Sequence, residues 1–524
     1  MKVKDLIFTV SSGLILFLSF PKIDFEPLAF GAFIPLLFAL KGKRLSQTFL
    51  LSLLAGIVFN LTLFHWVVVV MRDYGGLPLP LALLFLFLLA CYLGLYFAFT
   101  FTVARFIEKK KGLRMTITLP FLWVFFEYGK SYLLTGFPWE NLGYSQFLSL
   151  PLIQVADITG VYGISFLIIL CNTFLFSLFT SWKERKMIPW FETILTLILF
   201  PMVFFYGYTR IESVQEKVEK GQVIRVKLIQ PNMEQAVKWD PAYQEETLMI
   251  LESLSLTGTG DTPELIIWPE AATPFYFQLK GVYATQVVNI LRQAHAHCLL
   301  FGSPAFTVES SLVRYHNSAF LVSSQGEVLG RYDKIHLVPF GEYVPLQKLL
   351  FFVHKMVEDI GDFSPGEQPG VLSFEGKSLG VLICYEIIFP ELARKCVQKG
   401  SSFLVTITND AWFGKTSAPY QHNSMAILRA VENRVFVARA ANTGITSLID
   451  PAGKILYATE IFTPDVITGK ITLIKIPTLY NRYGDIFVLV CAVFFAVFLA
   501  GCFIRRDSGL GKFNPNHEHL TPKS

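Results

Sequence analysis

The sequence predicts a membrane protein in which eight transmembrane helices carry an outer domain of the α/β class. Three observations lead to this prediction. The chain has 524 residues, 53% of them hydrophobic and 50 of them phenylalanine, which is more apolar than a typical soluble chain. These apolar residues are concentrated in 5–209 and 484–504. Residues 210–483 instead alternate short apolar strands with helical stretches, as layered α/β domains do.

Eight apolar stretches are candidates for crossing a bilayer, which takes roughly 20 apolar residues. We expect spans near residues 5–20, 27–41, 48–71, 78–104, 115–135, 160–181, 188–209 and 484–504. The first stretch follows Lys2 and Lys4 and resembles the start of a signal peptide. It has no convincing small-residue cleavage site and more apolar stretches follow, so we interpret it as a span.

Lysine and arginine cluster in every second loop, and such clusters mark the cytoplasmic side of a membrane. The clusters lie at 2–4, 41–44, 105–114, 183–186 and 505–506. The short loops of the opposite side contain little besides Lys22 and Arg72. We therefore expect both termini in the cytoplasm and the outer domain on the opposite side of the membrane, which in a two-membrane bacterium is the periplasm. The predicted parts are a seven-helix domain (1–209), the outer domain (210–483), a last helix (484–504) and a polar cytoplasmic tail (505–524).

The charge of the chain argues against a nucleic-acid partner, and its cysteines bear on disulfides and metal binding. The formal charge is only +5 and the basic residues lie in short clusters, so we expect no nucleic-acid partner. Three of the seven cysteines, Cys298, Cys384 and Cys396, fall in the outer domain. A disulfide between Cys298 and Cys396 would leave Cys384 free, and spacing alone leaves that pairing open. No Cys/His spacing suggests zinc, and we expect neither a metal nor an organic cofactor.

The outer domain has the alternating pattern of an α/β fold. Buried strands are predicted at 223–232, 264–270, 298–306, 378–386 and 403–410, and hairpins at 317–337 and 443–457. Helices are predicted at 242–256, 284–296 and 423–441, the last from apolar residues at helical spacing. Strands that alternate with helices in this way indicate a layered sheet-and-helix domain.

Three polar residues follow predicted strands, where sites in α/β folds gather. They are Glu270 after "LIIWP", Lys334 after the first hairpin, and Cys384 at the end of "GVLIC". Together they suit acyl transfer: the glutamate takes the thiol proton, the thiolate forms a thioester, and the ammonium stabilises the oxyanion. Taken singly, each residue has an ordinary explanation: Glu270 as a solvated loop acid, Lys334 as a hairpin lysine and Cys384 as a packed core thiol.

Four stretches taken together resemble the motifs of the nitrilase superfamily. They are "WPEAATP" (268–274), "YDKIHLVPFGEYVP" (332–345), "LICYEIIFPE" (382–391) and "TNDAWFG" (408–414). That superfamily places a Glu–Lys–Cys triad on an α–β–β–α sandwich. The stretch "TGFPWENLGYSQ" (135–146) and the details of the others resemble one branch, the bacterial apolipoprotein N-acyltransferases. The resemblance covers both the apolar helices and the outer domain.

The resemblance implies a role for each residue that matches a motif. Glu270 would be the general base, Lys334 the oxyanion stabiliser and Cys384 the nucleophile. Glu342 would position the lysine and the acyl group, while Tyr385 and Glu386 would support the site. Residues expected near the substrate entrance or the lipid cavity are Trp239, Phe340, Trp412 and Phe413.

The implied reaction moves an acyl chain from a membrane phospholipid, through the cysteine, to the N-terminal S-diacylglyceryl-cysteine of apolipoproteins. This reaction is the last step of bacterial lipoprotein maturation, and we expect a monomer to perform it. Holding the site at the membrane avoids extracting lipid chains, which costs about 0.8 kcal/mol per CH₂. One alternative is a membrane-tethered amidase with a small amide substrate. Another is a transporter or binding protein with a degenerate domain, against which the intact Glu–Lys–Cys set argues.

Overall fold

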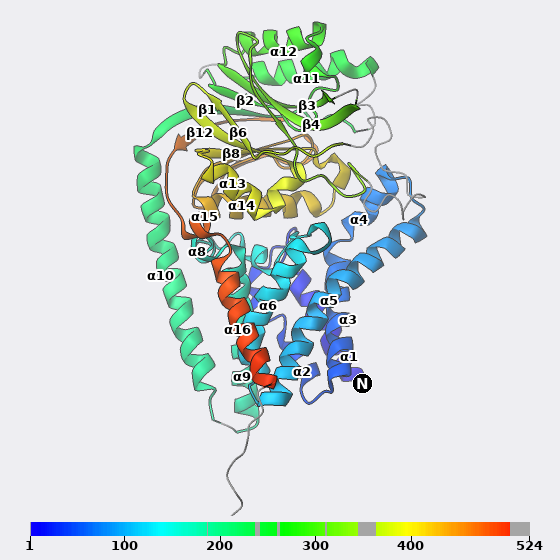
Figure 1. Ribbon diagram of the computed structural model, residues 1–524, viewed down its shortest axis with the longest axis vertical. Helices are drawn as coiled ribbons and strands as arrows, with labels where there is room; N and C mark the ends of the chain where they lie inside the picture. Colours follow the sequence, from blue (N-terminus) through cyan, green and yellow to red (C-terminus); the bar gives the residue numbers. More distant parts are fainter. Residues whose placement is uncertain are drawn as a thin grey trace, which may run out of the picture.

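The computed structural model describes residues 2–185, 187–235, 241–258, 262–309, 312–343 and 363–503. Apolar helices form one end of the molecule, and a domain of two stacked sheets sits on them (Figure 1). The last helix, α16 (Ile486–Phe503), returns from that domain to lie among the apolar helices. The predicted site residue Trp239 and the predicted tail 505–524 lie outside the described residues.

Among the described residues, five helices are long and apolar enough to cross a membrane. They are α3 (Leu45–Leu63), α5 (Leu79–Lys111), α9 (Val161–Lys183), α10 (Trp190–Lys220) and α16. Each falls on one of the eight predicted spans. The other three predictions fall on helices that are shorter or more polar, namely α1 (Val3–Phe17), α2 (Ile34–Leu40) and α6 (Met115–Tyr132). The predicted number of eight spans is therefore not confirmed.

Helices α3 and α5 approach each other closely because glycines face each other. A Cβ on Gly56 would lie 2.8 Å from Cα of Gly94, so no larger residue fits there without moving a backbone. Within a bilayer the hydrophobic effect does not drive helices together, so helices associate through close packing, which small residues allow. By contrast, α10 and α16 keep large apolar side chains exposed, among them Phe205 and Leu489, as lipid-facing helices do.

The first sheet of the outer domain has six strands with parallel neighbours at its centre. Their spatial order is β12 (Asp465–Leu473), β1 (Gln222–Gln230), β2 (Leu265–Ile267), β3 (Cys298–Glu309), β4 (Leu312–Ser323) and β5 (Val328–Asp333). Strands β1, β2 and β3 run parallel, and the remaining pairs are antiparallel. Helices α11 (Gln244–Leu256) and α12 (Val282–Gln293) pack their apolar residues on its outer face.

The second sheet also has six strands, and its inner face packs against the first. Its order is β11 (Ile455–Ala458), β10 (Ser447–Ile449), β9 (Val437–Ala441), β8 (Phe403–Thr408), β7 (Lys377–Ile383) and β6 (Gly370–Phe374). Apolar residues of both sheets form one cluster between them. Helices α13 (Pro390–Gln398) and α14 (Ala418–Asn433) form the layer between this sheet and the apolar helices (Figure 1). The predicted α–β–β–α sandwich is confirmed.

Several of the predicted elements are wrong at one end, among them the strand 264–270, which ends at Ile267. Residues 423–441 do not form one helix, because α14 ends where Arg434 adopts a φ of +53° and residues 437–441 form the central strand β9. That strand pairs with β8 and β10, which outweighs the helical spacing of the apolar residues before it. The predicted strand 378–386 ends at Ile383, and the next five residues form a 3₁₀ helix.

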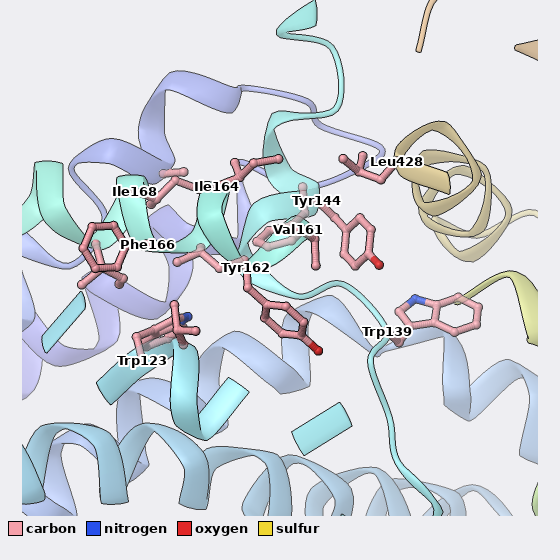
Figure 2. Close-up of a cluster of buried hydrophobic side chains, with 14 of the residues drawn as sticks. Trp123, Trp139, Tyr144, Val161, Tyr162, Ile164, Phe166, Ile168 and Leu428 are labelled. Atoms are coloured by element: carbon pink, nitrogen blue, oxygen red, sulfur yellow. The ribbon is translucent and has the colours of Figure 1, made fainter. Parts of the chain in front are cut away.

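Helix α14 joins the outer domain to the apolar helices, and all of its residues except Tyr420 are buried. The carboxamide of Gln421 accepts hydrogen bonds from the indoles of Trp66, at 3.0 Å, and Trp139, at 2.9 Å. Further along the helix, Arg429 donates to the hydroxyl of Tyr144 at 2.8 Å. Figure 2 shows Leu428 of α14 in the same buried cluster as Trp139 and Tyr144. These two residues belong to the membrane part, by which we mean the apolar helices and the loops that join them. The two parts of the chain are therefore held by specific polar contacts as well as by packing.

The disulfide that spacing left open is not formed. Cys298 lies in β3 of the first sheet and Cys396 on α13, and both thiols are free. Cys384 is free as well.

Candidate active site

Cys384 is the first residue of a 3₁₀ helix (Cys384–Ile388) that follows the buried strand β7. Its φ is +51°, a left-handed conformation that costs a non-glycine residue about 1–3 kcal/mol. Only 8% of the residue is exposed. The sequence placed this cysteine at the end of the strand, and the structure places it one residue beyond, where the chain turns sharply. Such a turn fixes the direction of the thiol.

Glu270 comes from the other sheet, in the loop after β2. A Cβ on Gly302 of the neighbouring strand β3 would lie 2.7 Å from Cα of Glu270, so this glycine lets the loop approach. The backbone N–H of Asn409, which follows β8, donates to Oε2 of Glu270 at 2.9 Å. The carboxylate is therefore held between the ends of both sheets, and only 6% of the residue is exposed.

Lys334 follows β5 and reaches the same carboxylate. Its Nζ lies 3.5 Å from Oε1 of Glu270 and 3.0 Å from Oε1 of Glu342, and the side chain is almost fully buried. Burial alone would lower the pKa of this lysine, but the charges of Glu342 and Glu270 outweigh it and raise the pKa. Lys334 therefore carries a positive charge inside the site.

The thiol of Cys384 lies within the electrostatic reach of both groups. Burial raises its pKa well above the usual range, the charge of Glu270 raises it further, and the ammonium of Lys334 opposes the rise. The three predicted residues, from β2, β5 and β7, are thus brought to one place. At neutral pH the sulfur holds its proton, so a thiolate forms only when a nearby base removes that proton.

Glu342 is tied to the lysine by more than charge. Its second oxygen, Oε2, accepts the backbone N–H of Val338 at 2.8 Å, so both oxygens are engaged.

Glu386 has a different function, because its carboxylate connects the two sheets. It accepts hydrogen bonds from the Tyr332 hydroxyl and from the N–H groups of Ile335, His336 and Ile383, all at 2.7–3.1 Å. The loop of Lys334 and the turn of Cys384 are thereby fixed to each other.

The sequence analysis missed Asn317 of β4. Its Nδ2 donates to Oε1 of Glu270 at 2.7 Å and to Oε1 of Glu342 at 2.8 Å, so one amide bridges the two glutamates. The available signal was a polar residue within the buried stretch "NSAFLVS", although a strand asparagine has no recognisable role without its cross-strand neighbours.

Replacing Asn317 by alanine is expected to slow acyl transfer about 10²-fold. The two carboxylates would then face each other with only Lys334 between them, and such like charges drive one of them to take up a proton. A protonated Glu270 loses its capacity to act as a base. The measurement is the rate of acyl-enzyme formation in Asn317→Ala. Gln325→Ala, in the exposed turn after the same strand, is the control, and equal rates in the two variants would contradict the bridge.

The aromatic residues predicted near the lipid entrance lie against the membrane part. Trp412 packs on Tyr74 with ring centroids 5.3 Å apart, and Phe413 packs on Trp66 at 5.1 Å. The loop that carries them is also bound by the hydroxyl of Tyr74, which donates to the carbonyl of Ala411 at 2.6 Å.

Of the remaining predicted aromatics, Tyr385 is also placed at this side of the site. It stacks on Trp139 with centroids 6.5 Å apart. Phe340 is partly exposed, at 37%, two residues before Glu342. Tyr385, Trp412 and Phe413 therefore lie where the outer domain meets the apolar helices.

Comparison with known proteins shows which families the chain resembles. Residues 225–478 match the family model of the carbon–nitrogen hydrolases, and residues 12–174 match that of the apolipoprotein N-acyltransferase N-terminal domain. Apolipoprotein N-acyltransferase of Geobacter metallireducens is 46% identical over 507 residues, 96% of each chain. The Pasteurella multocida protein of the same name is 34% identical, over 92% of this chain and 93% of its own. A solved amidase from Nesterenkonia is 22% identical, covering 50% of this chain and 92% of its own, with a TM-score of 0.36.

A carbon–nitrogen hydrolase domain carried by apolar helices defines a membrane-bound enzyme of the nitrilase superfamily. Within that superfamily, the chain belongs to the apolipoprotein N-acyltransferase family. It is an acyltransferase, as the sequence predicts, and the alternative of a small-amide amidase is not favoured.

Proposed function

We propose that this enzyme acylates the N-terminal S-diacylglyceryl-cysteine of apolipoproteins in two steps, with a membrane phospholipid as acyl donor and Cys384 as the intermediate carrier. The observation that carries the proposal is the buried thiol of Cys384 beside two groups of opposite charge. Burial and the charge of Glu270 raise the pKa of this thiol, and the charge of Lys334 lowers it. This set sits at the junction with the apolar helices, where substrates that remain in the bilayer are available.

In the first step the sulfur of Cys384 attacks an ester carbonyl of the phospholipid while Glu270 takes the thiol proton. The ammonium of Lys334 stabilises the oxyanion that develops on the carbonyl oxygen. The ester C–O bond then breaks, and Glu270 returns the proton to the departing oxygen. The products are a lysophospholipid and a thioester on Cys384.

In the second step the α-amine of the lipoprotein's first cysteine attacks the thioester carbonyl as a neutral nucleophile. Glu270 accepts the proton that the amine loses, the C–S bond breaks as the amide bond remains, and Glu270 returns the proton to the sulfur to restore the thiol. Water must be excluded between the steps, since it would hydrolyse the thioester. Burial of Cys384 and the aromatic residues around the loop of Trp412 and Phe413 suit this requirement.

The membrane arrangement that fits this chemistry has eight crossings of the bacterial inner membrane, with α1, the segment that contains α2, and α6 completing the set. Basic clusters before α1 and at the end of α5 favour a cytoplasmic position for those ends. The sheets and Cys384 would then face the periplasm, and a monomer contains every residue of the proposed site.

Incubation of the detergent-purified enzyme with phospholipid vesicles tests the two-step reaction. Intact mass spectrometry is expected to find a gain of one acyl chain that hydroxylamine removes, because hydroxylamine cleaves thioesters. Cys384→Ala should acquire no such mass. If the folded wild-type enzyme gained no adduct, or if Cys384→Ala gained the same one, the covalent step through this thiol would be excluded.

Labelling with a membrane-impermeant maleimide tests the orientation. In right-side-out inner-membrane vesicles we expect Gln325→Cys, on an exposed turn of the outer domain, to react at once. Lys110→Cys, at the exposed end of α5, should react only after the membrane is opened. The wild-type chain gives the background from native cysteines, and the reverse labelling pattern would invert the topology.

A further inference from the structure

His422 lies directly behind the nucleophile and has no role in the proposed two steps. It belongs to α14, and its side chain is fully buried. Its Nε2 lies 3.1 Å from the carbonyl oxygen of Cys384. Because a carbonyl oxygen only accepts hydrogen bonds, Nε2 carries a proton and donates it to this carbonyl.

The other side of the ring is held by a buried charge pair. Nη2 of Arg439 lies 3.2 Å from Nδ1 and donates to it, which suits a ring whose proton is on Nε2. Oδ1 of Asp410 lies 3.0 Å from Nδ1, and Oδ2 of Asp410 accepts from Nη2 of Arg439 at 2.5 Å. The hydroxyl of Thr408 donates to Oδ1 of Asp410 at 2.9 Å. Asp410 and Arg439 are both fully buried. The imidazole is therefore fixed in its plane from β8 and β9, the two strands that follow β7 across the sheet.

A face of the same ring touches the membrane part. The indole of Trp139 stacks on the imidazole with centroids 5.4 Å apart and planes at 22°. The carbonyl of Trp139 in turn accepts a hydrogen bond from Nζ of Lys130 on α6, at 3.4 Å. His422 thus connects a loop between apolar helices to the backbone of the nucleophile.

We propose that His422 is a positioning residue for acyl transfer, which holds the left-handed backbone of Cys384 through its Nε2–H. The carbonyl of Cys384 meets this donor in the conformation in which the residue has a φ of +51°. In that conformation the sulfur and the N–H groups that follow it keep one direction relative to Glu270 and Lys334. The proposal rests on the proposed function, because it takes Cys384 as the nucleophile.

The test compares His422→Leu with His422→Gln in the full-length enzyme in detergent. Leucine fills the space without a donor, whereas glutamine can present an amide N–H near the position of Nε2. We expect His422→Leu to slow single-turnover acyl-enzyme formation about 10²-fold, as small displacements of reacting groups do. The KM for phospholipid should stay within about twofold, and His422→Gln should recover at least about tenfold of the lost rate.

Ser424→Ala is the matched control, because Ser424 lies two residues further on α14 and donates to Glu140 of the membrane part instead. It should acylate at the wild-type rate, which separates the positioning effect from a general loosening of the helix. A structural role alone would shift the unfolding midpoint and KM together with kcat, and glutamine would rescue nothing. That result, or a wild-type rate in His422→Leu, overturns the proposal.

Two further measurements keep the test decisive. If His422→Leu does not accumulate as folded protein, Asp410→Asn takes its place, with the same loss of kcat at constant KM expected. If the wild-type enzyme forms no acyl adduct, the proposed function fails by itself. The positioning is then measured by alkylation of Cys384 with iodoacetamide, where His422→Leu should differ from the wild type and from His422→Gln. Equal alkylation of all three proteins would overturn it.

Discussion

Glu270→Gln is expected to lower the rate of acyl-enzyme formation about 10³-fold, within the range that general bases supply. Glutamine has nearly the same shape and still accepts the N–H of Asn409, but it takes up no proton. The effect is large because burial raises the pKa of Cys384, so the free thiolate is scarce at neutral pH. The loss should shrink as the pH rises, because more of the thiol ionises without help.

The measurement is single-turnover acylation by intact mass at several pH values. Glu264→Gln is a suitable control, because Glu264 precedes the same strand and pairs with Lys377, at 2.6 Å, away from the site. It should leave the rate unchanged. If Glu270→Gln acylated Cys384 at the wild-type rate, another group would have to accept the proton, and the role proposed for Glu270 would be wrong.

The positions of Glu270, Lys334 and Cys384 were predictable because strand ends meet at a common edge of each sheet. Short motifs that follow strands therefore mark a site even when the packing of the sheets is unknown. Asn317 and His422 escaped prediction for the opposite reason. Each lies within an element, and its partner is far away in the sequence. Asn317 contacts Glu270, 47 positions away in the loop after another strand of the same sheet, and His422 contacts the turn of Cys384, 38 positions away.

The errors in the fold have similar physical causes. The spacing of apolar residues from Met425 to Val435 leads to a predicted helix that extends to residue 441. Residues 437–441 instead pair with two neighbouring strands, and this pairing decides their structure. Helix α6 contains Glu127 and Lys130, which bind the loop after it: Glu127 accepts the N–H of Leu142 at 2.7 Å and Lys130 donates to the carbonyl of Trp139. These polar residues make α6 less apolar than the five helices of the described residues that are long and apolar enough to cross a membrane.

Asp157→Asn is expected to destabilise the protein by about 3–5 kcal/mol, as the loss of one partner from a buried ion pair does. Oδ2 of Asp157, in the membrane part, accepts from Nη2 of Arg434 and from Nε of Arg210, both at 2.8 Å. Arg434 ends α14 and is fully buried, so the substitution leaves a cation without a carboxylate at the junction of the two parts. The measurement is the free energy of unfolding in detergent, followed by tryptophan fluorescence.

Arg210→Gln is the matched control for this junction. The side chain of Arg210 is 21% exposed, and its removal leaves the pair of Asp157 and Arg434 in place. Partly exposed pairs contribute little, so a loss of at most about 1 kcal/mol is expected. If the two variants were equally stable, the charge of Asp157 would not hold the outer domain on the apolar helices. A large difference would mean that a buried ion pair holds the site on the apolar helices, because Arg434 directly follows the helix that carries His422.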